Sequence, residues 1–112
     1  MQDVEAAFVS SLTWAELALE VHAVTSLAEY KRRTARVNRL RAMFGEGLPF
    51  DDHCAQAYDA ALEHVTERGG SPKAHRFDRM IAATAAANGL ALVTRNSGDF
   101  LQLRGLVEVV ER

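Results

Sequence analysis

The chain has 112 residues, of which 48% are hydrophobic and 25% charged, and its formal net charge at pH 7 is −2. This length suits one hydrophobic core, so we expect a single domain, residues 1–112, and the near-neutral charge excludes a polycation that coats nucleic acid. One cysteine, Cys54, cannot form an internal disulfide, and neither a membrane-spanning apolar run nor a basic signal start is present, so we expect a cytoplasmic protein with no membrane contact.

The first half of the chain predicts a strand followed by two helices. Residues 6–11 (AAFVSS) are short and apolar, which is typical of a buried strand. Thr13 is expected to begin a helix with one apolar face. A second helix is predicted from about Ser26 to Phe44, where Gly45 ends it.

The next segment predicts a further strand and two more helices. Residues 48–51 (LPFD) fit a short strand that leads into a helix capped near Asp51 or Asp52. A clear helix follows over Phe77–Asn88, and Gly89 ends it. Its apolar residues recur at helical spacing and predict one buried stripe of Phe77, Met80, Ile81 and Ala85.

The C-terminal part predicts two strands. Residues 90–94 (LALVT) form a continuous apolar run, the pattern of a strand buried on both faces. A short turn or helix is expected around Ser97–Leu103, and Leu106–Val110 is the last predicted strand. Strands that alternate with helices indicate an α/β fold with a mostly parallel sheet flanked by helices. In such sheets, ligand sites lie beyond the carboxyl ends of the strands.

Three carboxylates lie where that rule directs attention. Glu16 follows the first predicted strand, Asp78 lies in the first turn of the Phe77–Asn88 helix, and Asp99 follows the 90–94 strand by five residues. Carboxylate oxygens suit Mg²⁺ or Mn²⁺, which prefer oxygen ligands and keep several waters. Such an ion promotes the ionisation of water and offsets charge on a phosphodiester.

Each acid also has a purely structural explanation. Thr13 and Glu16 have the spacing of a capping box, in which the glutamate bonds back to the start of the helix. Asp78 suits the positive end of its helix, and the segment Asn96–Asp99 can be a capped turn. Spacing alone leaves both explanations open.

A longer pattern resembles a known family. Residues 76–100 (RFDRMIAATAAANGLALVTRNSGDF) are similar to the C-terminal signature of PIN-domain nucleases of the VapC toxin type: an acid that begins an alanine-rich helix, a glycine, and a closing "LVTRN–DF". Residues 10–17 (SSLTWAEL) resemble the family's earlier acidic motif. Altogether the resemblance covers residues 7 to 110.

The resemblance implies an activity and a site. PIN nucleases hydrolyse RNA with one or two divalent ions, and a cognate antitoxin holds VapC proteins inactive. Glu16, Asp78 and Asp99 are then expected as the catalytic, metal-binding acids with Mg²⁺ or Mn²⁺ as the cofactor, and Asn96 is expected to orient Asp99 or contact the substrate. A homodimer is also expected from the family.

The family's usual first strand has no counterpart in this sequence. That strand ends in a motif like LLDTN, whose aspartate is a principal metal ligand, and Asp3 is the only aspartate before Glu16. We therefore expect a PIN-like domain that lacks this strand because the true start codon lies upstream. Two alternatives are a catalytically inactive remnant that binds an antitoxin or dimerises, and a second chain that supplies the strand.

Basic side chains offer contacts for RNA. Arg76, Arg79 and Arg95 lie near the proposed acids in sequence and are expected to bind substrate, although Arg79 is equally suited to pair with an acid. A basic stripe also runs through the second helix, where it is either a solvated face or a contact for RNA phosphates or an acidic antitoxin. Its members are Lys31, Arg32, Arg33, Arg36, Arg39 and Arg41.

Overall fold

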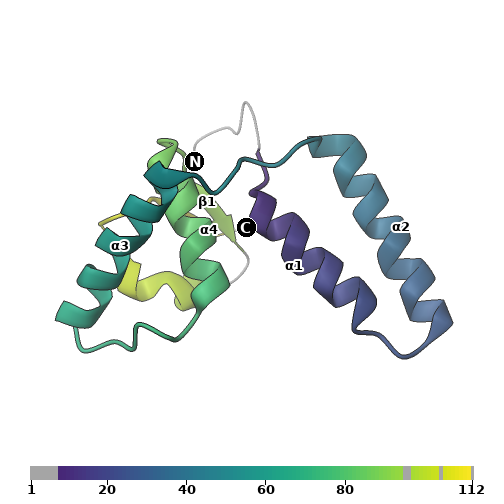
Figure 1. The fold of residues 1–112 in the computed structure, drawn as a ribbon, viewed down its shortest axis with the longest axis horizontal. Coiled ribbons are helices and arrows are strands. Elements are labelled where there is room, and N and C mark those ends of the chain that lie inside the picture. The colour runs from purple at the N-terminus through teal and green to yellow at the C-terminus, as the bar shows by residue number, and fades with distance from the viewer. Residues whose placement is uncertain (1–7, 95–96, 104, 112) are drawn as a thin grey trace. The chain divides into compact units, whose positions relative to one another are not determined.

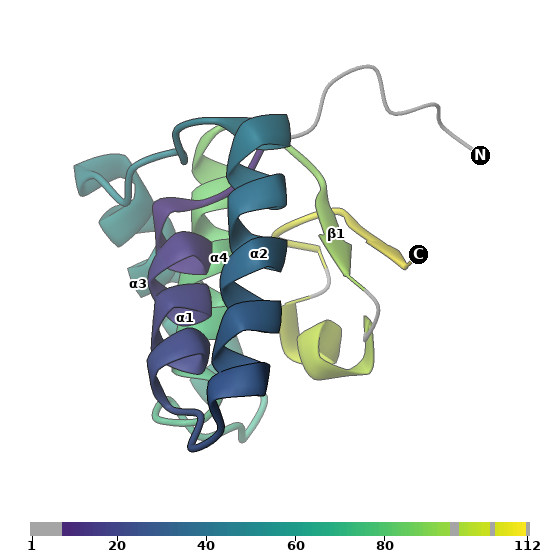
Figure 2. The ribbon, with the colours of Figure 1, turned by 90° about the vertical axis from the view of Figure 1, so that its right-hand side faces the viewer.

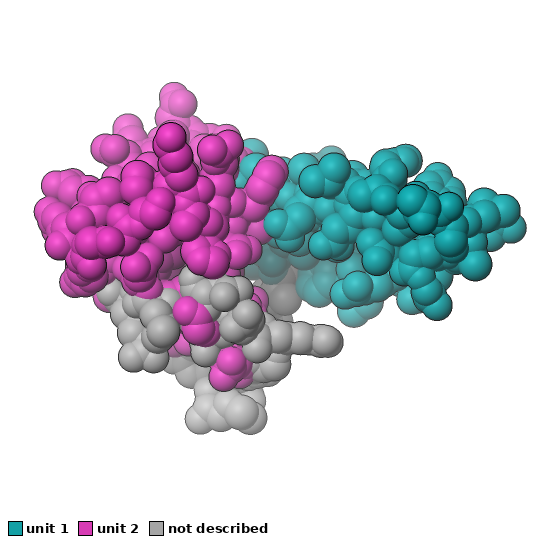
Figure 3. All heavy atoms as spheres, turned by 90° about the horizontal axis from the view of Figure 1, so that it is seen from below, with its two compact units in different colours: residues 1–49 teal, residues 50–112 magenta. Residues whose placement is uncertain are grey.

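The computed structural model describes residues 8–94, 97–103 and 105–111. By its internal contacts the chain divides into two compact units, residues 1–49 and 50–112, coloured separately in Figure 3. Each unit is described by itself below. The expectation of a single domain stays a prediction.

Unit 1 is a pair of helices joined by a short connection, α1 (Ser11–His22) and α2 (Leu27–Phe44), which run side by side in opposite directions (Figures 1 and 2). The expectation that α1 begins at Thr13 is wrong. Ser10 is the N-cap, and its side chain accepts a hydrogen bond from the Leu12 N–H at 3.1 Å. The helix therefore starts two residues earlier, because a serine outside the helix satisfies one of its free N–H groups.

The bounds predicted for α2 are confirmed. Ser26 caps the helix by accepting from the Glu29 N–H at 3.0 Å, and Gly45 ends it with φ of 68°. None of its residues is fully buried, and its apolar residues Leu27 and Tyr30 are exposed. In α1, by contrast, Trp14 is buried.

The two short strands predicted in unit 1 meet in one parallel bridge between Ser10 and Leu48. The Ser11 N–H donates to the Leu48 carbonyl at 2.8 Å, and the Leu48 N–H donates to the Val9 carbonyl at 2.7 Å. Residues 6 and 7 of the first predicted strand lie outside the described residues. The backbone at Gly47 runs close to α1, since a Cβ there would lie 2.7 Å from the Ser11 nitrogen.

Unit 2 packs two helices, α3 (Asp52–Glu67) and α4 (Arg76–Ala87), with two short strands and a 3-10 helix. Asp51 is the N-cap of α3, as the sequence predicts, and its carboxylate accepts from the Cys54 N–H at 3.1 Å. This bond holds the pKa of Asp51 below its ordinary value, because it stabilises the charged form. Cys54, the one cysteine of the chain, is fully buried.

The sheet of unit 2 pairs β1 (Leu92–Thr94) with β2 (Val109–Glu111) in parallel. Leu92 lies opposite Val109, and Thr94 lies opposite Glu111. The α/β class with parallel pairing is confirmed. Burial of β1 on both faces is not, because Val93 is 52% exposed. In the described chain this strand has β2 as its one partner and packs only its Leu92 face on the core.

The core of unit 2 lies between α3, α4, the strands and the 3-10 helix η1 (Ser97–Leu103), whose bounds match the predicted segment. In α4, the buried residues include four in succession, from Ala82 to Ala85, so small side chains are buried over more than one stripe. Phe77 is 42% exposed and not part of the core, which corrects the predicted stripe. In the part of the chain that the structure describes, no helix is long and apolar enough to cross a membrane.

Candidate functional site

Asp78 lies at the open N-terminal end of α4. His75 precedes the helix with φ of 52°, a left-handed conformation rare for a residue with a side chain, and makes no side-chain capping bond. The Asp78 carboxylate keeps 38% of its side chain exposed, and His75 Nδ1 lies 3.9 Å from its Oδ2. Exposed ion pairs of this length add little stability. The carboxylate remains accessible at the surface of unit 2.

Asp99 lies in η1, which the core holds by two buried side chains, Phe100 and Leu103. These two residues are three positions apart, so they lie on one side of the 3-10 helix and dock that side on the core of unit 2. The side chain of Asp99 lies outside the described part of the chain, as do residues Arg95 and Asn96. The roles expected for these three residues stay predictions.

Glu16 belongs to unit 1, where it lies in the second turn of α1 and is half-buried. The capping-box explanation of this residue requires Thr13 as the N-cap. Because the N-cap is Ser10, that explanation is wrong. Glu16 does interact with its surroundings in the structure.

The two arginines of the α4 start are placed differently. Arg76 is exposed at the first helical position. Arg79 is only 2% exposed, and its guanidinium donates from Nη1 to the Ser71 carbonyl at 2.6 Å and from Nη2 to Gln102 Oε1 at 2.9 Å. Gln102 was not among the predicted site residues. An isolated glutamine between two leucines carries no motif, so no pattern in the sequence marks it.

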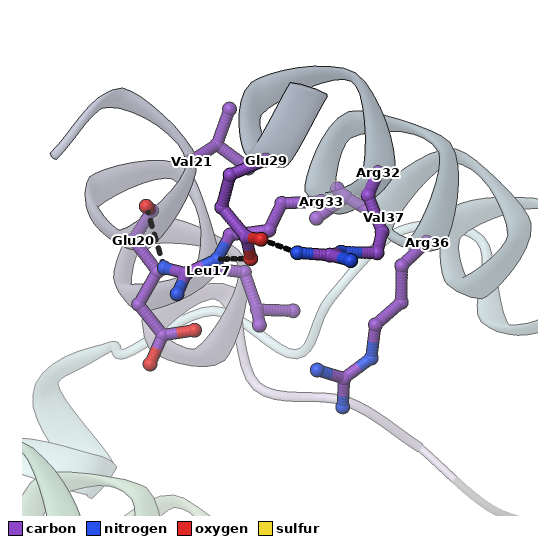
Figure 4. Close-up of a pocket in the computed structure, with 8 residues that line it drawn as sticks. All are labelled: Leu17, Glu20, Val21, Glu29, Arg32, Arg33, Arg36 and Val37. Carbon is purple, nitrogen blue, oxygen red and sulfur yellow. Dashed lines mark hydrogen bonds and ion pairs between the residues drawn. The ribbon is translucent and has the colours of Figure 1, made fainter. Parts of the chain in front are cut away.

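The basic stripe of α2 is partly neutralised within its own helix. Glu29 forms ion pairs with Arg32 and Arg33, and Arg33 also donates to the Glu20 carbonyl of α1 at 3.0 Å. Figure 4 shows these side chains around a hollow between the two helices, with Arg36 extending along its edge. The hollow has a volume of about 380 Å³. Further along, the Arg41 guanidinium lies 4.8 Å from the centre of the Trp14 ring. The residues that line the hollow are Leu17, Glu20, Val21, Glu29, Arg32, Arg33, Arg36 and Val37.

Within the residues that the structure describes, no three His, Cys, Asp or Glu side chains gather closely enough to hold a metal ion together. The chemistry of the predicted donors nevertheless fits a hard divalent ion. Asp78 offers an exposed carboxylate, and Asp99 and Glu16 would add carboxylate oxygens, which are the ligands that Mg²⁺ and Mn²⁺ prefer.

Comparison with known proteins defines the class. The family model "PIN domain" matches residues 1–106, and the chain therefore belongs to the PIN-domain family. Within it, the chain groups with VapC-type toxins. It is 33% identical over 104 residues to "VapC ribonuclease Y4jK" of Sinorhizobium fredii, a match that covers 88% of this chain and 71% of that protein.

Several solved structures share the fold, among them a member of the VapBC family of toxin–antitoxin systems. A chain in the crystal structure of VapBC-5 from Mycobacterium tuberculosis superposes with a TM-score of 0.83 at 30% identity, and the match covers 94% of this chain and 81% of that one. A chain of FitAcB from Neisseria gonorrhoeae gives a TM-score of 0.79 at 28% identity, over 98% and 78% of the two chains. These matches confirm the PIN-like α/β architecture that the sequence motifs predicted.

Proposed function

We propose that this protein is a metal-dependent endoribonuclease toxin that a cognate antitoxin inhibits. The observation that carries the proposal is the placement of Asp78. The helix α4 has more buried residues than α3, yet the carboxylate at its N-terminal end is exposed. The chain also resembles a VapC ribonuclease. Among the described residues, its ion-pair partner is His75, 3.9 Å away. An acid kept accessible without a structural partner of consequence is suited to bind an ion or a substrate.

Asp78 and Asp99 would hold Mg²⁺ or Mn²⁺, with Glu16 as the third acid. The bound ion would supply a Lewis acid that polarises the phosphodiester and promotes the ionisation of water. The protein's own contribution is to fix the carboxylates, and the rigid start of α4 does so for Asp78. The backbone N–H groups of that helix start also direct positive charge toward the acid.

Arg76 is the basic residue best placed to bind the RNA backbone. Its guanidinium is exposed at the first position of α4, two residues from Asp78, and arginine binds phosphate oxygens through two parallel hydrogen bonds. Arg95 and Asn96 complete the proposed substrate contacts. The RNA is then held against the same helix end that carries the acid.

The antitoxin is proposed from the structural relatives, which include VapBC-5, a member of the VapBC family of toxin–antitoxin systems. A homodimer is proposed from the resemblance to the VapC family alone. In this system the antitoxin would be the cognate partner of this chain, and free toxin would be the active form.

The test is an RNA-cleavage assay with the full-length protein and total RNA. Cleavage is expected with Mg²⁺ or Mn²⁺ and is expected to stop with EDTA and return when the ion is restored. Cleavage that persists in EDTA would overturn the metal dependence. A folded protein that cuts no RNA with either ion would overturn the enzyme proposal in favour of an inactive PIN remnant that binds the antitoxin.

A further inference from the structure

We propose that Arg79 is a positioning residue that holds η1, the segment of Asp99, in a fixed orientation against the first turn of α4, the segment of Asp78. The inference rests on the proposed function, because it concerns how two acids of the proposed site are kept together. It assigns Arg79 a role inside the fold instead of direct contact with RNA. All the residues involved belong to unit 2.

One buried guanidinium joins three segments of the chain. Arg79 lies in α4 directly after Asp78, and it donates to the Ser71 carbonyl at 2.6 Å and to Gln102 Oε1 at 2.9 Å. Ser71 belongs to the connection that leads into α4. Gln102 lies in η1, three residues after Asp99. The two hydrogen bonds therefore tie the backbone that precedes Asp78 and the short helix of Asp99 to the same side chain.

The Gln102 amide is held from its other side by Gly70. A Cβ at Gly70 would lie 2.7 Å from Gln102 Nε2 and 2.8 Å from its Oε1, so the amide packs directly on the glycine backbone. Gly70 is itself anchored to α3, because its N–H donates to the Val65 carbonyl at 2.9 Å. The amide of Gln102, itself an exposed residue, thus contacts both the Gly70 backbone and the Arg79 guanidinium.

The chemistry of these contacts favours a geometric role over a contribution to stability. Among the described residues, the hydrogen-bond acceptors of Arg79 are neutral oxygens. Burial of a cation with neutral partners costs more free energy than burial of an apolar side chain of the same length. Phe100 and Leu103 already dock η1 by apolar burial, which has no direction. A planar guanidinium adds direction, because its donors have a fixed fork geometry.

The experiment compares Arg79→Met with wild type and with Arg68→Met. Arg68 is an exposed arginine of the same unit whose bonds return to His64 of its own helix, so Arg68→Met removes the same chemical group without touching η1. Four quantities are measured: Mn²⁺ affinity by calorimetry, kcat and KM for RNA cleavage, and the melting curve. Arg79→Lys and Gln102→Met are measured alongside.

For Arg79→Met we expect Mn²⁺ affinity and kcat to fall by about 10- to 100-fold, the range seen when a residue that orients metal ligands is lost. KM should change little, and the protein should still melt cooperatively. Gln102→Met should reproduce the loss with Arg79 intact, and Arg79→Lys should restore it only in part, because one ammonium cannot reproduce the fork. Arg68→Met should match wild type.

Wild-type Mn²⁺ affinity and kcat in both Arg79→Met and Gln102→Met would overturn the proposal, and so would a rise in KM with kcat unchanged, which indicates direct contact with RNA. If Arg79→Met does not fold, Gln102→Met decides alone. If wild type binds Mn²⁺ without cutting RNA, the proposed function fails, while the affinities of the variants still decide the role of Arg79. If wild type does not bind Mn²⁺, both fail.

Discussion

Replacing Asp78 by asparagine should affect RNA cleavage strongly and the stability of unit 2 only slightly, so it tests the proposed chemistry apart from folding. The change keeps the shape of the side chain and removes its charge. The carboxylate is 38% exposed and its ion pair with His75 spans 3.9 Å, so that pair contributes at the low end of the 0–1 kcal/mol typical of surface pairs. An acid in the first turn of a helix adds roughly 0.3–1 kcal/mol. The total loss should therefore stay near or below about 1 kcal/mol.

For a unit of this size, about 1 kcal/mol lowers the melting temperature by roughly 4–8 °C at most. Loss of a metal ligand acts on a different scale. Since residues that merely orient ligands change activity by about 10- to 100-fold, removal of a ligand itself should lower kcat/KM by at least about 100-fold. This fall corresponds to about 2.7 kcal/mol of transition-state stabilisation.

The matched control is Asp52→Asn, which removes an exposed acid from the first turn of α3 in the same unit. It should cost similar stability and leave RNA cleavage unchanged. The assays are thermal unfolding and cleavage of RNA with Mg²⁺ under identical conditions. Cleavage by Asp78→Asn at the wild-type rate, with a normal melting curve, would refute the assignment of this acid to the site.

Two further changes test the fold. Leu103→Ala should lower the free energy of unfolding by about 2–5 kcal/mol because it empties a site only 2% exposed, whereas Leu106→Ala, at a position 38% exposed, should cost much less; denaturant midpoints that do not differ would contradict the described core. Asp51→Ala should destabilise at neutral pH. The bond from Cys54 lowers the folded-state pKa of Asp51, so its contribution is full above the unfolded pKa and is lost as pH falls through the folded one; a difference from wild type that grows on acidification would exclude this linkage.

Local signals in the sequence predicted most of the fold because capping and chain reversal depend on neighbouring residues. Ser26, Asp51 and Gly45 set helix ends where the pattern placed them. The start of α1 was misplaced because Thr13 and Glu16 have the spacing of a capping box, whereas the backbone shows that Ser10 is the N-cap. Spacing alone could not supply that information.

Burial was harder to predict, because it depends on which segments of the chain meet. Phe77 and Val93 have apolar side chains in regular patterns and are nevertheless exposed, whereas the charged Arg79 is buried. The acids of the site were proposed from sequence motifs, which identify residues by their chemical type and spacing. The bond from Arg79 to Gln102 spans 23 positions and no motif records it.

The contrast between Asp78 and Arg79 restricts how α4 can be turned about its own axis. Each step along an α-helix rotates the side chain by about 100°, so these neighbours face very different surroundings. A shift of the helix by one residue that put Asp78 in the place of Arg79 would bury the carboxylate and move the guanidinium away from Ser71 and Gln102. Only one rotation of α4 about its axis therefore keeps both side chains in their present surroundings. The left-handed backbone at His75 lies directly before the helix, where the chain turns into α4.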